Sequence, residues 1–393
     1  MTEQTVVANR AEIVLGIDLG TSFSTAAAWV DGKMHLITDS RGEACIPSVV
    51  YFPTQGAPVI GAYAAKMRLS EPTQSIGGIK RVLGRPYDSG EVRILDAHSA
   101  VKIEKAPNGS PVLCTRAGTH TPVEIASHIY RQLRELAEAR FRSSCKKAVI
   151  TIPATANAQT EAATIMAARA AGLDVIRTVS EPVAGAIAQQ LDQFQGERRL
   201  LVYDFGGGTF DVTVLHQQNQ EFRVLALGGD SCLGGDDLDL ELAQLVSSFI
   251  FHSHKVDLSK DVVTWDRLVR ESEVVKRGLS SVMAAPMRIK ELFSAQGRRR
   301  DLDLTVTRAD AEARWEPLIQ RSIQLTATTM MQAGLRPEDL DAILLVGGST
   351  YVPMVRSKVA KTFGKPGVHQ SDPQTAVAEG AALMAARALS LAA

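Results

Sequence analysis

LLVYDFGGGTFDVTVL, residues 200–215, is the stretch from which the fold of this chain can be inferred. An apolar run ends at Asp204, three glycines follow, and a second β-branched run starts at Phe210. This pattern predicts a strand, a tight glycine turn and an antiparallel strand. Because glycine lacks Cβ, the backbone N–H groups of the turn can close on a phosphate, with a cation between that anion and Asp204. Taken by itself, the stretch could also be an ordinary glycine hairpin that follows an acid.

Similar turns occur at two other places in the chain. Residues 13–22 read IVLGIDLGTS, in which an apolar run reaches Asp18 before a Gly-Thr pair, and a further apolar run follows at 26–30. Residues 343–350 read ILLVGGST and contain a third glycine turn. Two strand–Asp–Gly–Thr turns predict a duplicated phosphate-binding domain that faces itself across a cleft.

Composition limits the class of protein. The chain has 393 residues, enough for two or more domains, with 45% hydrophobic and 22% charged residues, as in soluble globular proteins. The formal net charge of +0 gives no basis for a nucleic-acid partner. The 4 cysteines include no CxxC pair, which favours a reducing compartment without a structural metal. No stretch is long enough to span a membrane, and Asp18 interrupts the only candidate leader, so we expect a cytoplasmic protein.

Capping residues predict several helices. Thr121 before a proline, and Thr307 before a charged run, predict the starts of two helices, and a third is expected at 157–172. Residues 90–119 alternate apolar residues with turn residues, which indicates a small β-rich insertion. The basic cluster Arg298–Arg300 is expected in a solvated loop. Strands alternating with helices in both halves predict an α/β architecture.

Two helices consist almost entirely of small residues, at 180–188 and 375–382. Such helices can cross closely and could hinge two lobes. Glu181 lies in the first turn of the earlier one, where an acid is also favoured simply by the helix dipole. Lys80 follows the Gly77-Gly78 pair, and surface charge is its simplest interpretation.

A helix expected from about residue 264 has an unusual polar face. Helical spacing places Glu273, Lys276, Arg277 and Ser280 on one side, apart from the apolar residues. This face is either solvated, with one Glu–Lys pair, or turned toward a nucleoside.

A set of motifs resembles, in order, those of the nucleotide-binding domain of the seventy-kilodalton heat-shock chaperones (the DnaK type), within the actin-like ATPase superfamily. The resemblance covers roughly residues 12–388. The motifs are IDLGTS (17–22), IKR (79–81), TIPA (151–154), Glu181-Pro182, YDFGGGTFD (203–211), LGGD (233–236) and VGGST (346–350).

The resemblance implies a duplicated actin-like (ribonuclease-H-like) ATPase fold, with two lobes around a nucleotide cleft. Lobe I would span 11–190, with 47–119 as its small subdomain, and would be completed by 371–388. Lobe II would span 191–370, with 236–317 as its small subdomain. On this division we expect no peptide-binding domain in the chain, which would then be either a fragment or a stand-alone ATPase domain, and the departures described below favour the second.

The resemblance also implies ATP or ADP with Mg²⁺ in the cleft, and a role for each matching residue. Asp18 and Asp204 would bind hydrated Mg²⁺. The catalytic residues would be Lys80, Glu181, Thr209 and Asp211. The nucleotide would be held by Gly20, Thr21, Ser22, Gly206, Gly207, Gly208, Thr209, Gly235, Glu273, Lys276, Arg277, Ser280, Gly347, Gly348, Ser349, Tyr351 and Asp372.

The chain departs from the family pattern at several positions. Tyr351 stands where many members stack an arginine on adenine, and Arg277 could still cover one adenine face. Thr155-Ala156 replaces two larger residues, and Glu161 replaces a basic one, in the region that senses the interdomain linker. The family's partners are co-chaperones and a nucleotide-exchange factor. Arg177 fits the family's docking pattern for J-domain co-chaperones, whereas two other positions, Ser180 and Val183, do not.

The expected function is a slow, Mg²⁺-dependent ATPase, acting as a monomer, whose lobes open and close with nucleotide state. A nucleotide-gated regulator that barely hydrolyses ATP is the alternative, favoured by the departures just described. An actin-like filament is less consistent with Lys80 and the LGGD motif. A sugar kinase would need a base for a hydroxyl acceptor, and no residue can be nominated for it.

Overall fold

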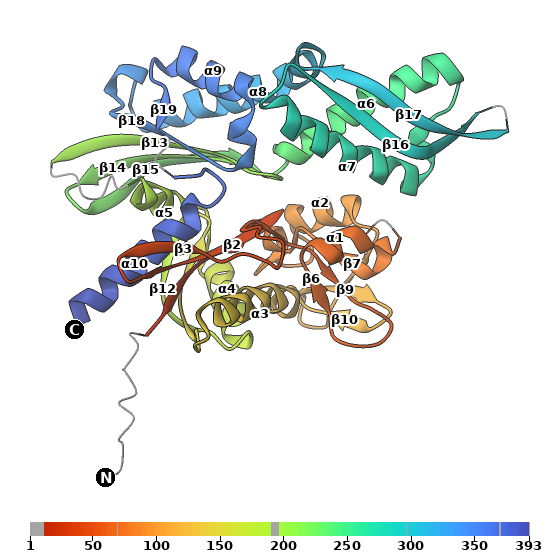
Figure 1. Cartoon of the computed structure of the whole chain (residues 1–393). Coiled ribbons are helices and arrows are strands. Elements are labelled where there is room, and N and C mark those ends of the chain that lie inside the picture. The colour runs from red at the N-terminus through yellow and green to blue at the C-terminus, as the bar shows by residue number, and fades with distance from the viewer. Residues whose placement is uncertain (1–11, 69, 190–195, 296, 369–370, 393) are drawn as a thin grey trace, which may run out of the picture.

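Two mixed sheets with the same strand order form the centres of two lobes (Figure 1). The computed structural model describes residues 12–68, 70–189, 196–295, 297–368 and 371–392. The first lobe has the order β12-β11-β1-β2-β3, and the second has β19-β18-β13-β14-β15. In each sheet, the first three strands of that order are parallel and the last two are antiparallel to their neighbours. The predicted duplicated two-lobed fold is therefore confirmed.

The first sheet contains β1 (Val14–Asp18), β2 (Phe23–Val30), β3 (Lys33–Leu36), β11 (Lys147–Ile152) and β12 (Asp174–Ser180), with β4 (Ile46–Pro47) paired to β2. The second contains β13 (Glu197–Phe205), β14 (Phe210–Gln218), β15 (Glu221–Asp230), β18 (Ala342–Val346) and β19 (Gly367–Val368). The predicted hairpins are β1–β2 and β13–β14. Asp18 lies opposite Thr25 in the first, and Asp204 lies opposite Asp211 in the second.

The predicted helix starts are confirmed by their capping bonds. The Thr121 hydroxyl accepts a hydrogen bond from Glu124 N–H (3.2 Å) at the start of α3 (Pro122–Phe141). Asn157 caps α4 (Ala158–Ala170), and Thr307 caps α8 (Arg308–Gln332). Helix α9 (Pro353–Phe363) also lies in the second lobe, after the strand β18.

The two small-residue helices, α5 (Glu181–Ala188) and α10 (Ala376–Ala392), cross each other between the lobes (Figure 1). A Cβ placed on Gly380 would overlap the carbonyl oxygen of Ala184. Likewise, a Cβ on Gly16 in β1 would overlap the α10 backbone at Ala382. These contacts are possible because both positions lack a side chain, as predicted for a close crossing.

Each lobe carries a smaller group of elements beside its sheet. In the first lobe these are β5 (Val50–Tyr51), β6 (Val59–Ile60), α1 (Ala62–Met67), β7 (Ser75–Ile76), α2 (Gly90–His98), β8 (Lys102–Lys105), β9 (Pro111–Thr115) and β10 (Gly118–His120). In the second lobe they are α6 (Gly235–His254), α7 (Val262–Leu279), β16 (Ala284–Ala295) and β17 (Arg298–Thr307).

Two local predictions are wrong. Residues 90–98 form α2 rather than β structure, because Ser89 caps the segment (Val92 N–H to Oγ, 3.3 Å) and Val92 and Leu95 are buried one turn apart. Arg298–Arg300 begin β17, which pairs with β16, instead of lying in a loop. These arginines are nevertheless exposed, as expected, because this end of β17 is uncovered on both faces and burial in the strand starts only at Leu302.

Each lobe has its own apolar core, and a third cluster joins the two. This joining core contains Val149 and Val179 from the first sheet, Leu200 and Leu344 from the second, and Ala381 from α10. The predicted lobe boundary at 190/191 lies outside the described residues, and the one at 370/371 adjoins undescribed residues 369–370. Within the described part of the chain, no helix has the length and hydropathy needed to cross a bilayer.

Candidate functional site

A cavity of about 510 Å³ lies between the lobes and is lined by residues of both. It brings together the turns after β1, β13 and β18 with the polar face of α7. Every site residue predicted from the sequence lines it, except Gly208 and Asp372. Those that line it are Asp18, Gly20, Thr21, Ser22, Lys80, Glu181, Asp204, Gly206, Gly207, Thr209, Asp211, Gly235, Glu273, Lys276, Arg277, Ser280, Gly347, Gly348, Ser349 and Tyr351.

A largely buried ion pair lies on the first-lobe side of the cavity. Lys80, in the short 3₁₀ helix η2 (Ile79–Val82), lies with its Nζ 2.8 Å from Glu181 Oε1 at the start of α5. Burial opposes the charge of Lys80, but the carboxylates of Glu181 and Asp18 outweigh it and raise the lysine pKa. Burial also raises the pKa of Glu181 to about 7 against the effect of Lys80. Lys80 is therefore a fixed cation inside the cavity and not a surface charge.

Two more carboxyl groups face this pair from the second lobe. The pKa of Asp204 is well above its usual range because the group is buried beside Asp211 and Glu181. Burial likewise raises the pKa of Asp211, against the effect of Lys80. With Asp18, the cavity gathers four carboxyl groups around one lysine, so its potential attracts a cation.

The carboxyl groups do not form a closed metal cage. Among the described residues, no three His, Cys, Asp or Glu side chains converge as a metal-ligand set. Asp18 Oδ1 also accepts a hydrogen bond from the Thr151 hydroxyl (2.7 Å). Such a site suits Mg²⁺, which keeps several waters and needs only one or two carboxylates, better than a fully protein-ligated ion.

The glycine turn 206–208 is held by its neighbours. The carbonyl oxygens of Gly206 and Gly207 accept hydrogen bonds from the N–H groups of Gly235 (3.0 Å) and Asp236 (2.6 Å). The Ser349 hydroxyl also donates to Gly206 O (2.7 Å). A Cβ on Gly207 would overlap the Ser22 side chain from the opposite lobe. The turn can therefore approach the first lobe only because it consists of glycine.

Arg81 explains why Gly208 does not line the cavity. Its Nη2 atom, in the first lobe, donates to the Gly208 carbonyl oxygen in the second lobe at 2.6 Å. The arginine covers the place where a Gly208 side chain would stand. Arg81 thus connects the glycine turn to the lobe that carries Lys80.

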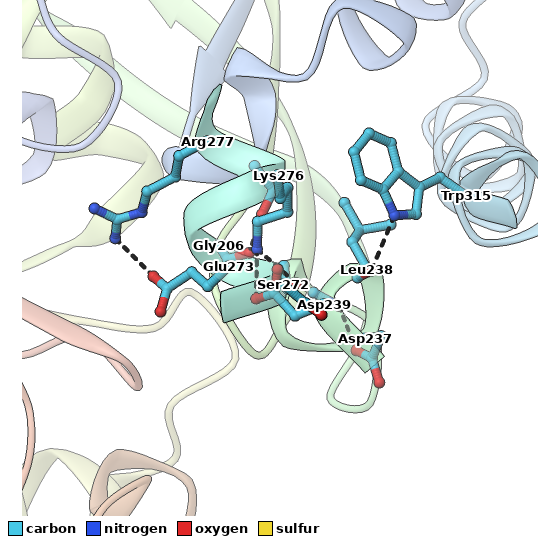
Figure 2. Close-up of polar contacts among 12 residues, drawn as sticks. Gly206, Asp237, Leu238, Asp239, Ser272, Glu273, Lys276, Arg277 and Trp315 are labelled. Carbon is cyan, nitrogen blue, oxygen red and sulfur yellow. Dashed lines mark hydrogen bonds and ion pairs between the residues drawn. The ribbon is translucent and has the colours of Figure 1, made fainter. Parts of the chain in front are cut away.

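The polar face of α7 lines the cavity. Figure 2 shows the contacts that Lys276 and Arg277 make on this face. Lys276 Nζ donates to Gly235 O and to Asp239 Oδ2, both at 2.7 Å. Arg277 pairs with Glu273 at 2.7 Å, at a more exposed position. Burial raises the pKa of Asp239 to about 7 although Lys276 opposes the shift. Lys276 thereby joins α7 to the start of α6.

Two arginine–aromatic pairs line the cavity. The Arg277 guanidinium lies 5.2 Å from the centre of the Phe23 ring, and that of Arg356 lies 5.2 Å from the centre of the Tyr351 ring. The Tyr351 hydroxyl donates to Asp372 Oδ1 at 2.5 Å. Asp372 therefore contacts the cavity wall through Tyr351 and does not line the cavity itself.

Several lining residues were missed by the sequence interpretation. Asp236 and Val346 lie next to glycines of the quoted motifs, and that adjacency could have identified them. Adjacency could also have identified four residues that directly follow predicted site residues: Phe23, Ser281, Val352 and Pro373. The others carry no such signal, because only the tertiary fold brings them to the cavity. They are Cys45, Arg356, Gln374 and Val377.

Comparison with known protein families agrees with this geometry. Residues 14–390 match the family described as Hsp70 protein, over almost the whole chain. The matched residues include both glycine hairpins, the α5–α10 crossing and the complete lining of the cavity. The match corresponds to the nucleotide-binding domain region of that family. The chain therefore belongs to the Hsp70 family and has its actin-like, two-lobed ATPase fold.

Proposed function

We propose that this protein binds ATP with Mg²⁺ and hydrolyses it slowly, and that the nucleotide state opens and closes the two lobes. The observation that carries the proposal is the cluster of four carboxyl groups around Lys80, beside glycine turns from both lobes. Phosphoryl transfer depends mainly on positioning and on charge neutralisation, and these residues can supply both.

The cavity fits a nucleotide in size and chemistry. Its volume of about 510 Å³ is in the range of small-molecule sites. Gly207 and Gly347 line the cavity without side chains, so their backbone can approach a phosphate chain closely. The cluster of carboxyl groups favours a bound cation, and Asp18 and Asp204 would hold it through water.

The chain's own residues would share the catalytic work. Bound Mg²⁺ would supply neutralisation of phosphate charge. Lys80, held by Glu181 at 2.8 Å, would donate to the terminal phosphate. Glu181, Thr209 and Asp211 would orient the attacking water. Because these groups are buried, their charges act with little screening by solvent.

The contacts between the lobes support a two-state switch. At Gly380 the α5–α10 crossing is a contact between backbones, so a change of the crossing angle would not have to displace a side chain there. Across the cleft, the polar connections include Arg81 to Gly208 and Arg277 to Phe23. A nucleotide that contacts both lobes would bind the closed state more tightly than the open state. This difference in affinity would shift the equilibrium between open and closed lobes toward the closed state.

The test is single-turnover ATP hydrolysis by the Lys80→Ala variant. We expect the rate to fall by about 100-fold or more, because one preorganised cation is lost. Exposed Lys102→Ala is the matched control and should hydrolyse at the parent rate. Since removing one partner of a buried pair costs about 3–5 kcal/mol of stability, melting and ATP binding must be measured for each variant. Equal rates for a folded, ATP-binding Lys80→Ala protein would refute the catalytic assignment.

A nucleotide-gated binding module with little hydrolysis is the second candidate. One contact favours it: the Thr178 hydroxyl donates to Glu161 Oε1 at 2.7 Å, so an acid that replaces the family's usual base is engaged within the first lobe. The same experiment separates the two candidates. Mg²⁺-dependent ATP binding by the parent protein without measurable turnover would support the second.

A further inference from the structure

One buried tyrosine of the first lobe has a hydroxyl group without a partner. Tyr130, on α3, is fully buried, and among the described residues none forms a hydrogen bond with its hydroxyl. Burying an unsatisfied hydroxyl lowers the folding equilibrium constant by about 5-fold to 150-fold. Such groups are therefore rare in native proteins, and an ordered water often satisfies them.

The neighbours of Tyr130 place it next to the first-lobe side of the cavity. Its ring belongs to the same apolar core as Ile17, the residue before Asp18 at the end of β1. Ile79, the residue before Lys80, is part of that core as well. Helix α3 also contacts η2, which carries this lysine. The tyrosine therefore packs behind the strand and the short helix that bring two charged groups to the cavity, and it does not line the cavity itself.

Two carboxyl groups of the cavity act on this hydroxyl. Burial raises the pKa of Tyr130 far above its usual value, and the charges of Asp18 and Glu181 raise it further. The hydroxyl therefore stays protonated and has a hydrogen to donate. The two carboxyl groups already have partners in the protein, since Asp18 accepts from the Thr151 hydroxyl and Glu181 pairs with Lys80. Each carboxylate nevertheless has room for further hydrogen bonds, because its two oxygens together accept about four.

A single water molecule can satisfy these three groups together. A tyrosine hydroxyl donates one hydrogen, whereas an ionised carboxylate only accepts. A water between them would accept from Tyr130 and donate one hydrogen to each carboxylate. It would then make three hydrogen bonds, which is the usual number for a buried water. A bond mediated by water is nearly as favourable as a direct one.

We propose that Tyr130 is a positioning residue of this site, and that its hydroxyl holds the carboxylates of Asp18 and Glu181 in place through one buried water. The inference rests on the proposed function, since it concerns how these carboxylates are held for hydrolysis. Because Tyr130 does not line the cavity, it acts only through the two acids. It should therefore affect the rate of hydrolysis more than the affinity for ATP, since the glycine turns and the polar face of α7 stay unchanged.

The experiment removes the hydroxyl alone. Tyr130→Phe keeps the ring in the apolar core. Tyr51→Phe is the matched control, because Tyr51 is also buried in the first lobe, donates to Glu71 Oε1 at 2.8 Å and does not line the cavity. For the full chain and both variants, calorimetry gives the affinity for MgATP and rapid mixing gives the single-turnover hydrolysis rate. Urea denaturation without Mg²⁺ or nucleotide gives the folding equilibrium constant.

Tyr130→Phe should lower the single-turnover rate by about ten-fold, as expected for a group that orients the residues around a metal ion, and should leave ATP affinity within about two-fold. Its folding equilibrium constant should stay within about five-fold of the parent value, because the lost hydrogen bond is offset by the hydroxyl that no longer has to be buried. Tyr51→Phe should show the opposite pattern. It should hydrolyse at the parent rate and fold with an equilibrium constant lower by about ten-fold or more, because a bond to a charged group is lost.

Three results would overturn the inference while leaving the proposed function intact. The first is a parent-like rate in Tyr130→Phe. The second is an equal loss of rate and of ATP affinity in that variant, which would mean that the cavity is distorted as a whole. The third is a folding equilibrium constant raised by more than about five-fold, which would mean that the hydroxyl has no partner in the folded protein. If the parent protein does not hydrolyse ATP, the proposed function fails and the inference fails with it.

Discussion

Asp204 and Asp211 are direct partners across the antiparallel β13–β14 pair, so their side chains lie on the same face of the sheet. Both carboxyl groups are largely shielded from bulk solvent, and the pKa of each is influenced by Lys80. One lysine, already paired with Glu181, cannot neutralise both. The pair is therefore a source of instability in the free protein and a source of affinity for a cation.

Asp204→Asn should remove the Mg²⁺ dependence of nucleotide binding. In the parent protein, we expect EDTA to weaken ADP binding by about ten-fold or more, because uncompensated carboxylates then face the phosphates. In the variant, calorimetric titrations with and without EDTA should give similar affinities. Exposed Asp303→Asn is the control and should keep the full dependence. A variant that still needs Mg²⁺ would contradict the role given to Asp204.

Arg81→Met should weaken binding of both ATP and ADP by about ten-fold, because the charged hydrogen bond that fixes the glycine turn at Gly208 is lost. Calorimetry measures the change directly. Arg85→Met is a matched control in the same segment, since Arg85 pairs only loosely with Glu91 at 3.4 Å. Equal affinities for Arg81→Met and the parent would show that the turn is rigid without this contact.

Asp239 should make stability depend on pH. Its folded pKa of about 7 lies above the usual value near 3.8, so the native protein holds more protons between these values and loses stability as pH rises through them. We expect urea denaturation of the free protein to show a drop between about pH 5 and pH 7.5 that is smaller by about 1 kcal/mol or more in Asp239→Asn.

Asp303→Asn serves again as the control for this measurement, since its carboxylate is exposed and its removal should leave the slope unchanged. Some slope should remain in Asp239→Asn, because the pKa of Glu181 is also raised to about 7. Identical slopes for the parent and Asp239→Asn would mean that Asp239 stays ionised beside Lys276 throughout this range.

Gly380→Ala should destabilise the protein by about 1–3 kcal/mol or more, because the added methyl group would overlap the Ala184 carbonyl oxygen at the α5–α10 crossing. The midpoint of chemical denaturation measures this loss. Gly90→Ala is the matched control: no atom lies within 4 Å of its added Cβ, so its stability should stay equal or rise slightly. A fully stable Gly380→Ala would mean that the helices separate easily.

Features set by neighbouring residues could be predicted from the sequence. Thr121, Asn157 and Thr307 cap helices through bonds to residues three positions ahead, so a short window contains the whole signal. The acids and glycines of the hairpins were identified for the same reason. The helix at 90–98 was missed because its glycine and polar residues suggested turns. Its buried apolar residues, Val92 and Leu95, cover only one helical turn, which is too little to show a helical periodicity.

Contacts between distant segments could not be predicted in this way. Arg81 reaches Gly208, which is 127 positions away, and nothing near either residue specifies the other. Arg356 could not be assigned to the cavity because its contact with Tyr351 depends on how η6 leads into α9. The acids and glycines at the strand ends could therefore be predicted from the sequence, whereas the contacts of Arg81 and Arg356 could not.

The matching strand orders of the two lobes also affect the direction in which a linear ligand could bind between them. Asp18 and Asp204 occupy equivalent positions, but their strand partners differ, being Thr25 in the first lobe and Asp211 in the second. A perfect repeat would offer a linear ligand two interchangeable ends, as a two-fold symmetric dimer does. Replacing a hydroxyl by a carboxyl group at one of the two positions removes this equivalence. A molecule charged at one end would then have a single favoured direction of entry.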